Sequence, residues 1–442
     1  MNGFFSKIKR PLMLLVDILL LYLALWLMLK LRFGPDAGLM WQKHFLAFSV
    51  IYPLWLLSFY VFGLYDLNLA KNTPSFYWAI LKATVLNGLL STTLFYLFPY
   101  FLGVTPKTNL FLNLLFFGIL FSLWRYLYNS FVKSSTLGRE IVIIGKNPKS
   151  LELAEKINSN PQLGYKIAAI IDPEKIEELN LKTNPNICTI VTAVNLDHYP
   201  ELAKKLYQHL AYFNFENFPD FYEKISGKVP LSQIDEIWFL NNLKEKERGV
   251  YEKIKRLSDI LIGLIVGAIT ILIFPFIALA IKLDSPGPIF YKQVRAGRNG
   301  KNFSLIKFRS MEKEAEKNGA VWAEKNDPRI TRVGKILRKS LIDELPQFID
   351  ILKGEISSIG PRPERPEFIA QLEEEIPFYQ NRHIVKPGLT GWAQVNFKYG
   401  NSKEDALEKL QYELYYIKNR SLFLDLKIIL KTVNTLLKGG TL

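Results

Sequence analysis

The stretch RLSDILIGLIVGAITILIFPFIALAIKLDSPGP, Arg256 to Pro288, decides how the chain is organised. Its apolar part exceeds the roughly 20 residues that an α-helix needs to cross a bilayer, but it contains Pro275. Proline removes a backbone donor and clashes with the preceding turn, so the helix is expected to break or kink at Phe274-Pro275. The segment is therefore either an ordinary fifth transmembrane helix or a re-entrant helix, over about residues 257–282, that enters and leaves on one side.

Four further apolar stretches lie in the first third of the 442-residue chain. Each reaches the length of a membrane span, and Tyr and Trp recur near their ends, at the depth of the membrane interface. The stretches are Leu12–Leu31, His44–Tyr65, Phe76–Leu102 and Asn109–Tyr128. Basic residues precede the first stretch and follow the fourth, so a four-helix transmembrane domain, residues 1–136, is expected to have both ends in the cytoplasm.

Short apolar runs that alternate with a helical pattern follow these spans. Four runs are typical of strands and one segment of a helix: Glu140–Ile144, Tyr165–Ile171, Cys188–Val194, Glu236–Leu240 and, as the helix, Pro148–Ile157. This alternation predicts a parallel sheet covered on both faces, in a Rossmann-like α/β domain over residues 137–245. Its first turn, GKNPKS, carries Asn147 and Ser150 where a dinucleotide-binding fingerprint has glycines, so no dinucleotide is expected.

The formal net charge of +15 narrows the class of ligand. Beside membrane segments, a basic balance favours anionic lipid and phosphorylated substrates, and no nucleic-acid partner is expected because zinc-finger and RNP-type motifs are missing from the sequence. The lone Cys188 excludes an internal disulfide.

Outside the cell the charged last domain, residues 250–442, would lack a nucleotide-activated substrate. Arg256 and Lys282 flank the apolar run, which also favours the re-entrant helix and a cytoplasmic face.

Basic motifs and rigid backbone crowd this last domain. KFRSM places Lys307 and Arg309 on one side of an extended segment, and GPRPERP fixes Arg362 between prolines. Arg338 lies in a further basic run, and Arg forks match phosphate oxygens two at a time. Alone, each motif has a structural explanation as an amphipathic strand, an exposed turn or a solvated helix face. Together they favour a diphosphate site at a bilayer surface.

An adjacent acid pair, Asp343 and Glu344, follows Arg338-Lys339 by one turn and precedes Pro346. Neighbouring helical residues point about 100° apart, so the two carboxylates are expected to have different roles. One suits attack on phosphorus to give an acyl phosphate, and the other suits Mg²⁺ binding or orientation of the reacting group. His383 is the only histidine of this domain, which disfavours histidine-based acid–base catalysis.

These motifs resemble those of the bacterial sugar transferases that move hexose-1-phosphate from a UDP-sugar to a polyprenyl phosphate. The resemblance is to their long form, with four membrane helices and a Rossmann-like insert ahead of the catalytic domain. The matching stretches are GPIFYKQVRAGRNGK (Gly287–Lys301), KFRSM (Lys307–Met311), DPRITRVGKILRKSLIDELPQ (Asp327–Gln347), GEISSIGPRPE (Gly354–Glu364), KPGLTGWAQVN (Lys386–Asn396) and YYIKNRSLFLDLKIILKT (Tyr415–Thr432). The match is specific from about Asp259 onward and architectural over the first 245 residues.

This resemblance implies an α-rich, monotopic catalytic domain held by a re-entrant helix that breaks near Pro275. Asp343 would be the nucleophile that attacks the sugar-bearing phosphate and expels UMP, before polyprenyl (undecaprenyl) phosphate takes the phosphosugar from the enzyme. Glu344, with Asp343, would support Mg²⁺ binding. Four basic residues match motif positions and are assigned to substrate phosphates: Lys307, Arg309, Arg338 and Arg362.

The resemblance also implies a place for the chain in the cell. It would be a multi-pass protein of the bacterial inner membrane, with membrane lipid around it and the catalytic domain on the cytoplasmic face. It would carry out the first membrane step of exopolysaccharide, capsule or O-antigen synthesis. The sequence does not specify the sugar, and it leaves a homodimer open. The family's usual Ser-Pro and Tyr-Asp are Phe274-Pro275 and Tyr412-Glu413 here.

Two other functions are weighed against this one. Tyr251-x-x-x-Lys255 has a Tyr/Lys spacing found in nucleotide-sugar epimerases and dehydratases, which can also pair four spans with a Rossmann domain. A non-catalytic basic scaffold on anionic lipid is the other alternative, and it leaves Asp343-Glu344 and Pro361-Arg362-Pro363 unexplained.

Overall fold

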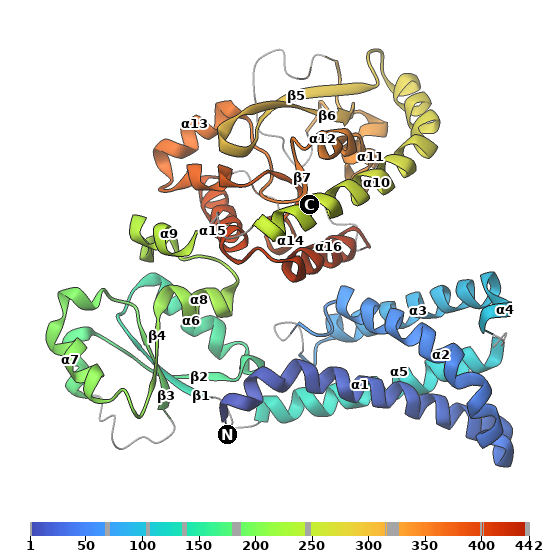
Figure 1. Ribbon diagram of the computed structural model, residues 1–442, viewed down its shortest axis with the longest axis horizontal. Coiled ribbons are helices and arrows are strands. Elements are labelled where there is room, and N and C mark those ends of the chain that lie inside the picture. The colour runs from blue at the N-terminus through green and yellow to red at the C-terminus, as the bar shows by residue number, and fades with distance from the viewer. Residues whose placement is uncertain are drawn as a thin grey trace. The chain divides into compact units, whose positions relative to one another are not determined.

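A computed structural model describes most of the chain in two compact units, Met1–Phe221 and Tyr222–Leu442 (Figure 1). The described residues are 2–66, 71–102, 107–134, 139–178, 187–243, 249–313, 315, 327–397, 400 and 402–437. The predicted domain ranges stay predictions, but the structure places the segment after Phe221 with the C-terminal residues rather than with the α/β domain.

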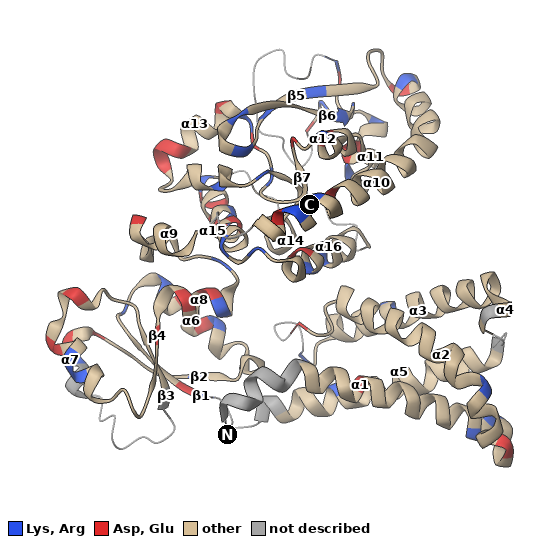
Figure 2. Ribbon diagram, in the orientation of Figure 1, with Lys and Arg blue, Asp and Glu red and all other residues tan. Residues whose placement is uncertain are grey.

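Long apolar helices open the first unit and confirm the four expected helical stretches. They are α1 (Asn2–Phe33), α2 (Ala37–Val61), α3 (Pro74–Leu97) and α5 (Lys107–Ser134), with the short α4 (Pro99–Leu102) before the last. By length and composition Pro11–Val61, Pro74–Leu97 and Thr108–Phe131 can cross a membrane, and these ribbons carry few charges (Figure 2). Inside the bundle, fully buried Arg125 and Asp17 form an ion pair at 2.6 Å, as buried charges require. The length and apolar composition of these helices identify the chain as a membrane protein.

A parallel sheet confirms the α/β expectation for the residues after these helices. Its strands β1 (Arg139–Ile144), β2 (Tyr165–Ile171), β3 (Ile187–Thr192) and β4 (Asn214–Asn217) run in the order β2-β1-β3-β4. Val142 and Ile144 pack with α7 (Pro200–Gln208), and the opposite face of β1 is buried as well. Such an order occurs in doubly wound sheets of the flavodoxin type, so the finer Rossmann-like description stays a prediction.

The turn after β1 shows what replaces the missing glycines. Asn147 caps α6 (Pro148–Asn158), because its Oδ1 accepts from Ser150 N at 2.8 Å while Asn147 N donates to Ser150 Oγ at 2.9 Å. This capping box engages N–H groups at the start of the helix, where a dinucleotide fold binds a pyrophosphate.

The strand predicted at Glu236–Leu240 is wrong: the segment is helix α9 (Glu236–Asn242). Asp235 caps it by accepting from Trp238 N at 2.8 Å. Trp238 and Phe239 pack against the core of the second unit, so tertiary contacts select the helix. The fourth strand is instead β4, whose sequence NFEN is too polar to be detected as an apolar run.

The second unit surrounds a long helix, α10 (Gly249–Asp284), and two small sheets. An antiparallel hairpin joins β5 (Phe290–Ala296) to β6 (Asn302–Phe308), and β7 (Ser357–Ile359) pairs in parallel with β8 (Gly388–Thr390). The other helices are α11 (Arg332–Ser340), α12 (Phe348–Lys353), α13 (Pro366–Glu375), α14 (Trp392–Asn396), α15 (Lys403–Asn419) and α16 (Leu422–Leu437). The segment that follows α8 (Phe218–Ser226) packs here, since Trp392 Nε1 donates to Gly227 O at 2.7 Å.

Helix α10 is bound to this unit at both ends. Near its start, Arg256 donates to the carbonyls of Ile351 and Leu352, each at 2.7 Å. At its end, Asp284 Oδ2 accepts from Val333 N at 2.8 Å. The helix continues through Pro275 without interruption, and its ribbon changes direction toward the C-terminal end (Figure 1).

One face of α10 is apolar and exposed, and it contrasts with the face packed on the unit. Gly263 and Gly267 lie against Leu352 and Phe348, where an added Cβ would come within about 3 Å of those side chains. The exposed large side chains recur at helical spacing: Leu257, Leu261, Leu264, Ile265, Ile269, Ile271, Leu272, Phe276, Leu279 and Leu283. An exposed apolar stripe of this length is suited to hydrocarbon rather than water.

Candidate active site

The acid pair lies in a short 3-10 helix, Ile342–Gln347, rather than in one helix with Arg338. Helix α11 ends because Leu341 adopts a left-handed conformation, with φ of 56°. Three residues make one turn of a 3-10 helix, so neighbouring side chains diverge by about 120°. The expected divergence of Asp343 and Glu344 therefore holds, but the geometry that produces it differs from the prediction.

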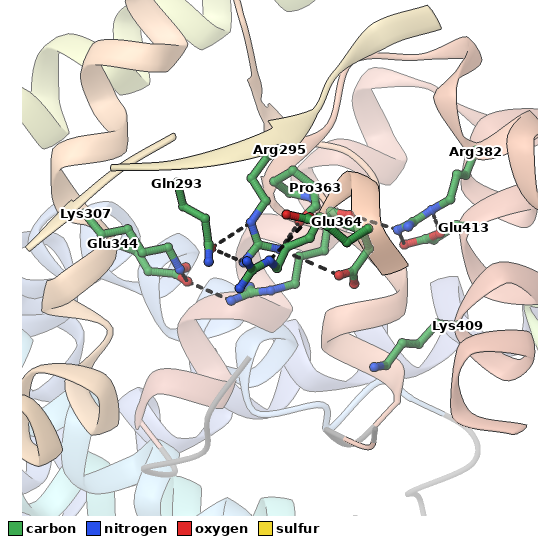
Figure 3. A network of polar contacts seen from close by, with 12 residues as sticks. Gln293, Arg295, Lys307, Glu344, Pro363, Glu364, Arg382, Lys409 and Glu413 are labelled. Carbon is green, nitrogen blue, oxygen red and sulfur yellow. Dashed lines mark hydrogen bonds and ion pairs between the residues drawn. The ribbon is translucent and has the colours of Figure 1, made fainter. Parts of the chain in front are cut away.

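Glu344 lies between two cations. Its Oε1 accepts from Lys307 Nζ and from Arg362 Nη2, each at 2.7 Å, and its side chain is only 8% exposed (Figure 3). Burial alone would raise the pKa of this carboxyl, but Arg362 and Lys307 lower it to about 2. Glu344 is therefore ionised at neutral pH, and it joins strand β6 to the turn carrying Arg362.

Asp343 has a different environment. Its side chain lines a cavity of about 280 Å³, and its buried Oδ1 has no hydrogen-bond partner among the described residues. Burial raises the pKa of Asp343, an effect that Lys307 opposes and Glu344 reinforces. Asp343 is thus the member of the pair that lines the cavity and has a carboxylate oxygen without a hydrogen-bond partner among the described residues.

The charge of the cavity wall suits an anionic ligand. Nine Lys and Arg residues line the cavity against four Asp and Glu residues, and Arg338 is among the nine. Among the described residues, Arg338 makes one side-chain hydrogen bond, a weak one of 4.0 Å to Met311 Sδ. A positive cavity of this kind offers charge-assisted hydrogen bonds to phosphate oxygens.

Arg309 also borders the cavity, but its guanidinium faces the end of α10. It donates to Ser285 O at 2.6 Å and to Pro286 O at 2.9 Å. These bonds satisfy carbonyls that a helix C-terminus leaves unpaired. In this arrangement Arg309 links strand β6 to the membrane helix. Lys307, Arg338, Arg362, Asp343 and Glu344 are the predicted residues that come together.

Two arginines that sequence reasoning missed hold the backbone around Arg362. Arg295 Nη1 donates to Pro363 O at 2.9 Å, and Arg382 Nη2 donates to Arg362 O at 2.8 Å (Figure 3). Arg382 is itself fixed by a two-pronged pair with Glu413, at 2.7 and 2.8 Å. Arg382 and Glu413 lie 31 positions apart, so no local sequence pattern predicts their pair. The prolines around Arg362 were the only sequence feature that pointed to this network.

The remaining singled-out residues are engaged elsewhere in the second unit. Tyr251 OH and Lys255 Nζ both donate to Asp425 Oδ2, at 2.9 and 3.2 Å, so the Tyr/Lys spacing belongs to a packing network of α10 and α16. Burial lowers the pKa of His383 to about 4, which keeps this imidazole neutral at pH 7. Because Tyr251 and Lys255 are both bound to Asp425, their spacing gives no structural basis for an epimerase-type site.

The donor set around Asp343 fits magnesium in one specific way. Among the described residues no three His, Cys, Asp or Glu side chains form a metal-binding group. Mg²⁺ commonly uses one or two carboxylates together with substrate phosphate oxygens and waters. Asp343, with its unpartnered Oδ1, could supply one such carboxylate, whereas Oε1 of the adjacent Glu344 is engaged by Lys307 and Arg362.

Comparisons with known proteins show the family of the chain. Residues 250–439 match the family described as bacterial sugar transferase. A UDP-N-acetylgalactosamine-undecaprenyl-phosphate N-acetylgalactosaminephosphotransferase from Aeromonas hydrophila is 43% identical over 238 residues, covering 54% of this chain and 55% of that protein. A UDP-glucose:undecaprenyl-phosphate glucose-1-phosphate transferase from Klebsiella pneumoniae is 34% identical over 325 residues, covering 67% of each chain.

A shorter relative matches a smaller share of the chain. The exopolysaccharide production protein PSS of Rhizobium leguminosarum bv. phaseoli is 43% identical over 171 residues, which cover 37% of this chain and 86% of that protein. The chain therefore spans about half the length of the Aeromonas relative and most of the shorter one. It belongs to the bacterial sugar transferase family.

Proposed function

We propose that the chain transfers a hexose-1-phosphate from a UDP-sugar to undecaprenyl (polyprenyl) phosphate, with release of UMP. The observation that supports this most directly is Asp343, which lines a cation-rich cavity and has a carboxylate oxygen without a partner among the described residues, while the neighbouring Glu344 is neutralised by Lys307 and Arg362. The names of the relatives supply both substrate classes. The reaction would be the first membrane step in making an exopolysaccharide, capsule or O-antigen.

The chemistry has two displacements at one phosphorus atom. A carboxylate oxygen of Asp343 attacks the phosphate that bears the sugar, its new bond to phosphorus replaces the bond to UMP, and UMP leaves with that electron pair. An oxygen of undecaprenyl phosphate then attacks the same phosphorus, and the bond to Asp343 breaks. The products are the free carboxylate and a sugar diphosphate lipid.

The basic residues of the cavity would stabilise the charge that develops in both steps. Arg338 has no strong partner among the described residues, so it can reach a phosphate oxygen without breaking an ion pair. Lys307 and Arg362 are already held by Glu344, so they are positioned before a substrate arrives. Mg²⁺, held by Asp343, Glu344 and substrate oxygens, would supply further charge neutralisation.

We also propose that α10 is a re-entrant helix and that the second unit lies on one face of the bilayer. A straight helix of 36 residues would be about 54 Å long, well over the roughly 30 Å of bilayer hydrocarbon. Both of its ends nevertheless bind the same folded unit, through Arg256 and Asp284. The need for a nucleotide-activated sugar supports the cytoplasmic face of the inner membrane.

Cysteine labelling tests this topology. Cys188 is the one cysteine of the chain and would be replaced; single cysteines at exposed Lys253 and Lys292 then report the two ends of α10. A membrane-impermeant maleimide should label both positions in inverted vesicles and neither in intact cells. Labelling of the two positions from opposite sides would show that α10 crosses the membrane.

UMP release from a panel of UDP-sugars tests the activity. Release should depend on undecaprenyl phosphate for multiple turnovers and should stop in Asp343→Asn, which keeps the size of the side chain but cannot form the acyl phosphate. Exposed Lys335 on α11 gives a matched control, since Lys335→Ala should keep full activity. Turnover by Asp343→Asn would rule out Asp343 as the nucleophile.

A further inference from the structure

Three phenylalanines connect the cavity to the membrane helix. Phe290 and Phe308 are paired across the β5–β6 hairpin, and their rings stack at 5.4 Å between centroids. Phe274, which precedes Pro275 in α10, stacks on Phe290 at 5.8 Å with an angle of 8° between the rings. Phe290 and Phe308 both line the cavity that contains Asp343. The stack therefore has one end in the membrane helix and one at the reaction site.

The exposure of the side chains along this stack indicates an apolar path from the membrane helix to the cavity. Phe308 is fully buried among α10 and α11 side chains, which fixes the base of the stack. Phe290 keeps 39% of its surface exposed, so part of its ring is open to a bound ligand or to lipid. Ile271, one turn before Phe274 and on the same side of α10, belongs to the exposed apolar stripe and is 69% exposed. An apolar surface thus continues from the lipid-facing helix to the cavity wall.

Basic residues of the cavity lie next to this apolar surface. Lys307 directly precedes Phe308, and Arg338 contacts Met311, which lines the cavity beside the two phenylalanines. A ligand with an anionic head and an apolar tail matches this order of surfaces. A nucleotide-sugar, which is polar along its whole length, does not require the apolar part.

We propose that the stack of Phe274, Phe290 and Phe308 is the binding surface for the first isoprene units of the acceptor lipid. The inference rests on the proposed function, and it assigns the two substrates to different walls of one cavity. The isoprenoid chain would leave the bilayer along the edge of α10 that carries Ile271 and Phe274 and lie across Phe290, with its phosphate directed toward Arg338 and Asp343. Phe274 in place of the family's usual serine would then be a part of the acceptor site as well as of the helix bend.

Phe290→Ala tests the proposal, with Phe276→Ala as the matched control, because Phe276 lies on the side of α10 opposite Phe274. Loss of a phenyl contact with an apolar ligand should raise the KM for undecaprenyl phosphate by about tenfold or more. The KM for the UDP-sugar, and the stoichiometric release of UMP in the absence of acceptor, should stay unchanged. Phe290→Leu, which keeps an apolar side chain, should recover most of the acceptor affinity, and Phe276→Ala should resemble the unmodified chain.

Each contrary result has a distinct meaning. An unchanged KM for undecaprenyl phosphate in Phe290→Ala, or a rise in the KM for the UDP-sugar alone, would overturn the assignment. If Phe290→Ala does not fold, Phe274→Leu, which removes only the ring, should raise the acceptor KM in the same selective way. Absence of UMP release in the unmodified chain would instead refute the proposed function and leave the stack unassigned for that separate reason.

Discussion

Removal of the Arg362 guanidinium should destabilise the second unit, because it leaves the buried Glu344 carboxylate with a single cation. Glu344 Oε1 now accepts one hydrogen bond from Arg362 and one from Lys307, both at 2.7 Å. A hydrogen bond to a charged group contributes about 1.5–3 kcal/mol. Arg362→Ala should therefore lower the free energy of unfolding by about 2 kcal/mol, or roughly 4–8 °C in unfolding temperature for a domain of this size.

The pH at which this deficit is measured follows from the pKa of Glu344. That pKa is lowered to about 2 from the ordinary value of 4.5, so the stabilisation is present in full above pH 4.5 and is lost as the pH falls toward 2. A measurement at pH 7 therefore captures the whole effect. Arg362→Lys should lose less than Arg362→Ala, because it keeps the charge although it loses the planar fork.

Protease resistance over a temperature series is a suitable assay for the chain in lipid nanodiscs. A C-terminal tag reports cleavage of the second unit separately from the transmembrane helices. Lys335→Ala, an exposed substitution on α11, is the control for loss of a positive charge. Equal midpoints for Arg362→Ala and Lys335→Ala would show that Glu344 does not depend on Arg362 for its stability, and would refute the reasoning.

Three further predictions concern the surroundings of this network. Burial raises the pKa of Asp343, so kcat/KM for the UDP-sugar should fall at acid pH with a midpoint above 3.8; Lys307→Ala should move that midpoint to higher pH in a pH–rate profile, and an unmoved midpoint would contradict this. Thr331→Ala removes the cap that accepts from Gly334 N at 3.0 Å, and it should cost about 1 kcal/mol in the same protease assay. Gly287→Ala should destabilise the chain more than Gly300→Ala, since an added Cβ would lie 1.9 Å from an Arg309 nitrogen at the first position and in open space at the second; equal midpoints would disprove that packing.

Apolar patterning was sufficient to predict most of the elements of the first unit. The runs at Glu140–Ile144 and Tyr165–Ile171 became strands because a parallel sheet buries both faces and therefore needs continuous apolar sequence. The same criterion failed at Glu236–Leu240, where Asp235 caps a helix and aromatic side chains reach a distant core. It also missed Asn214–Asn217, a strand at the edge of the sheet with polar residues.

The site divides in a similar way between local and long-range information. Asp343, Glu344, Lys307 and Arg362 were predictable because each lies in a short motif whose residue types suit phosphate chemistry. The roles of Arg295, Arg382 and Glu413 were not, because they depend on contacts between segments far apart in the sequence. Arg309 shows the converse, since its motif suggests a phosphate ligand while its hydrogen bonds go to the end of α10.

The most direct test is peptide mapping by mass spectrometry after the chain is mixed with a UDP-sugar and no undecaprenyl phosphate. We expect one equivalent of sugar phosphate on the peptide that contains Asp343, lost on later addition of undecaprenyl phosphate and never formed in Asp343→Asn. A chain that releases UMP and forms the lipid-linked product without any adduct at Asp343, or with the adduct on another residue, would contradict the central claim.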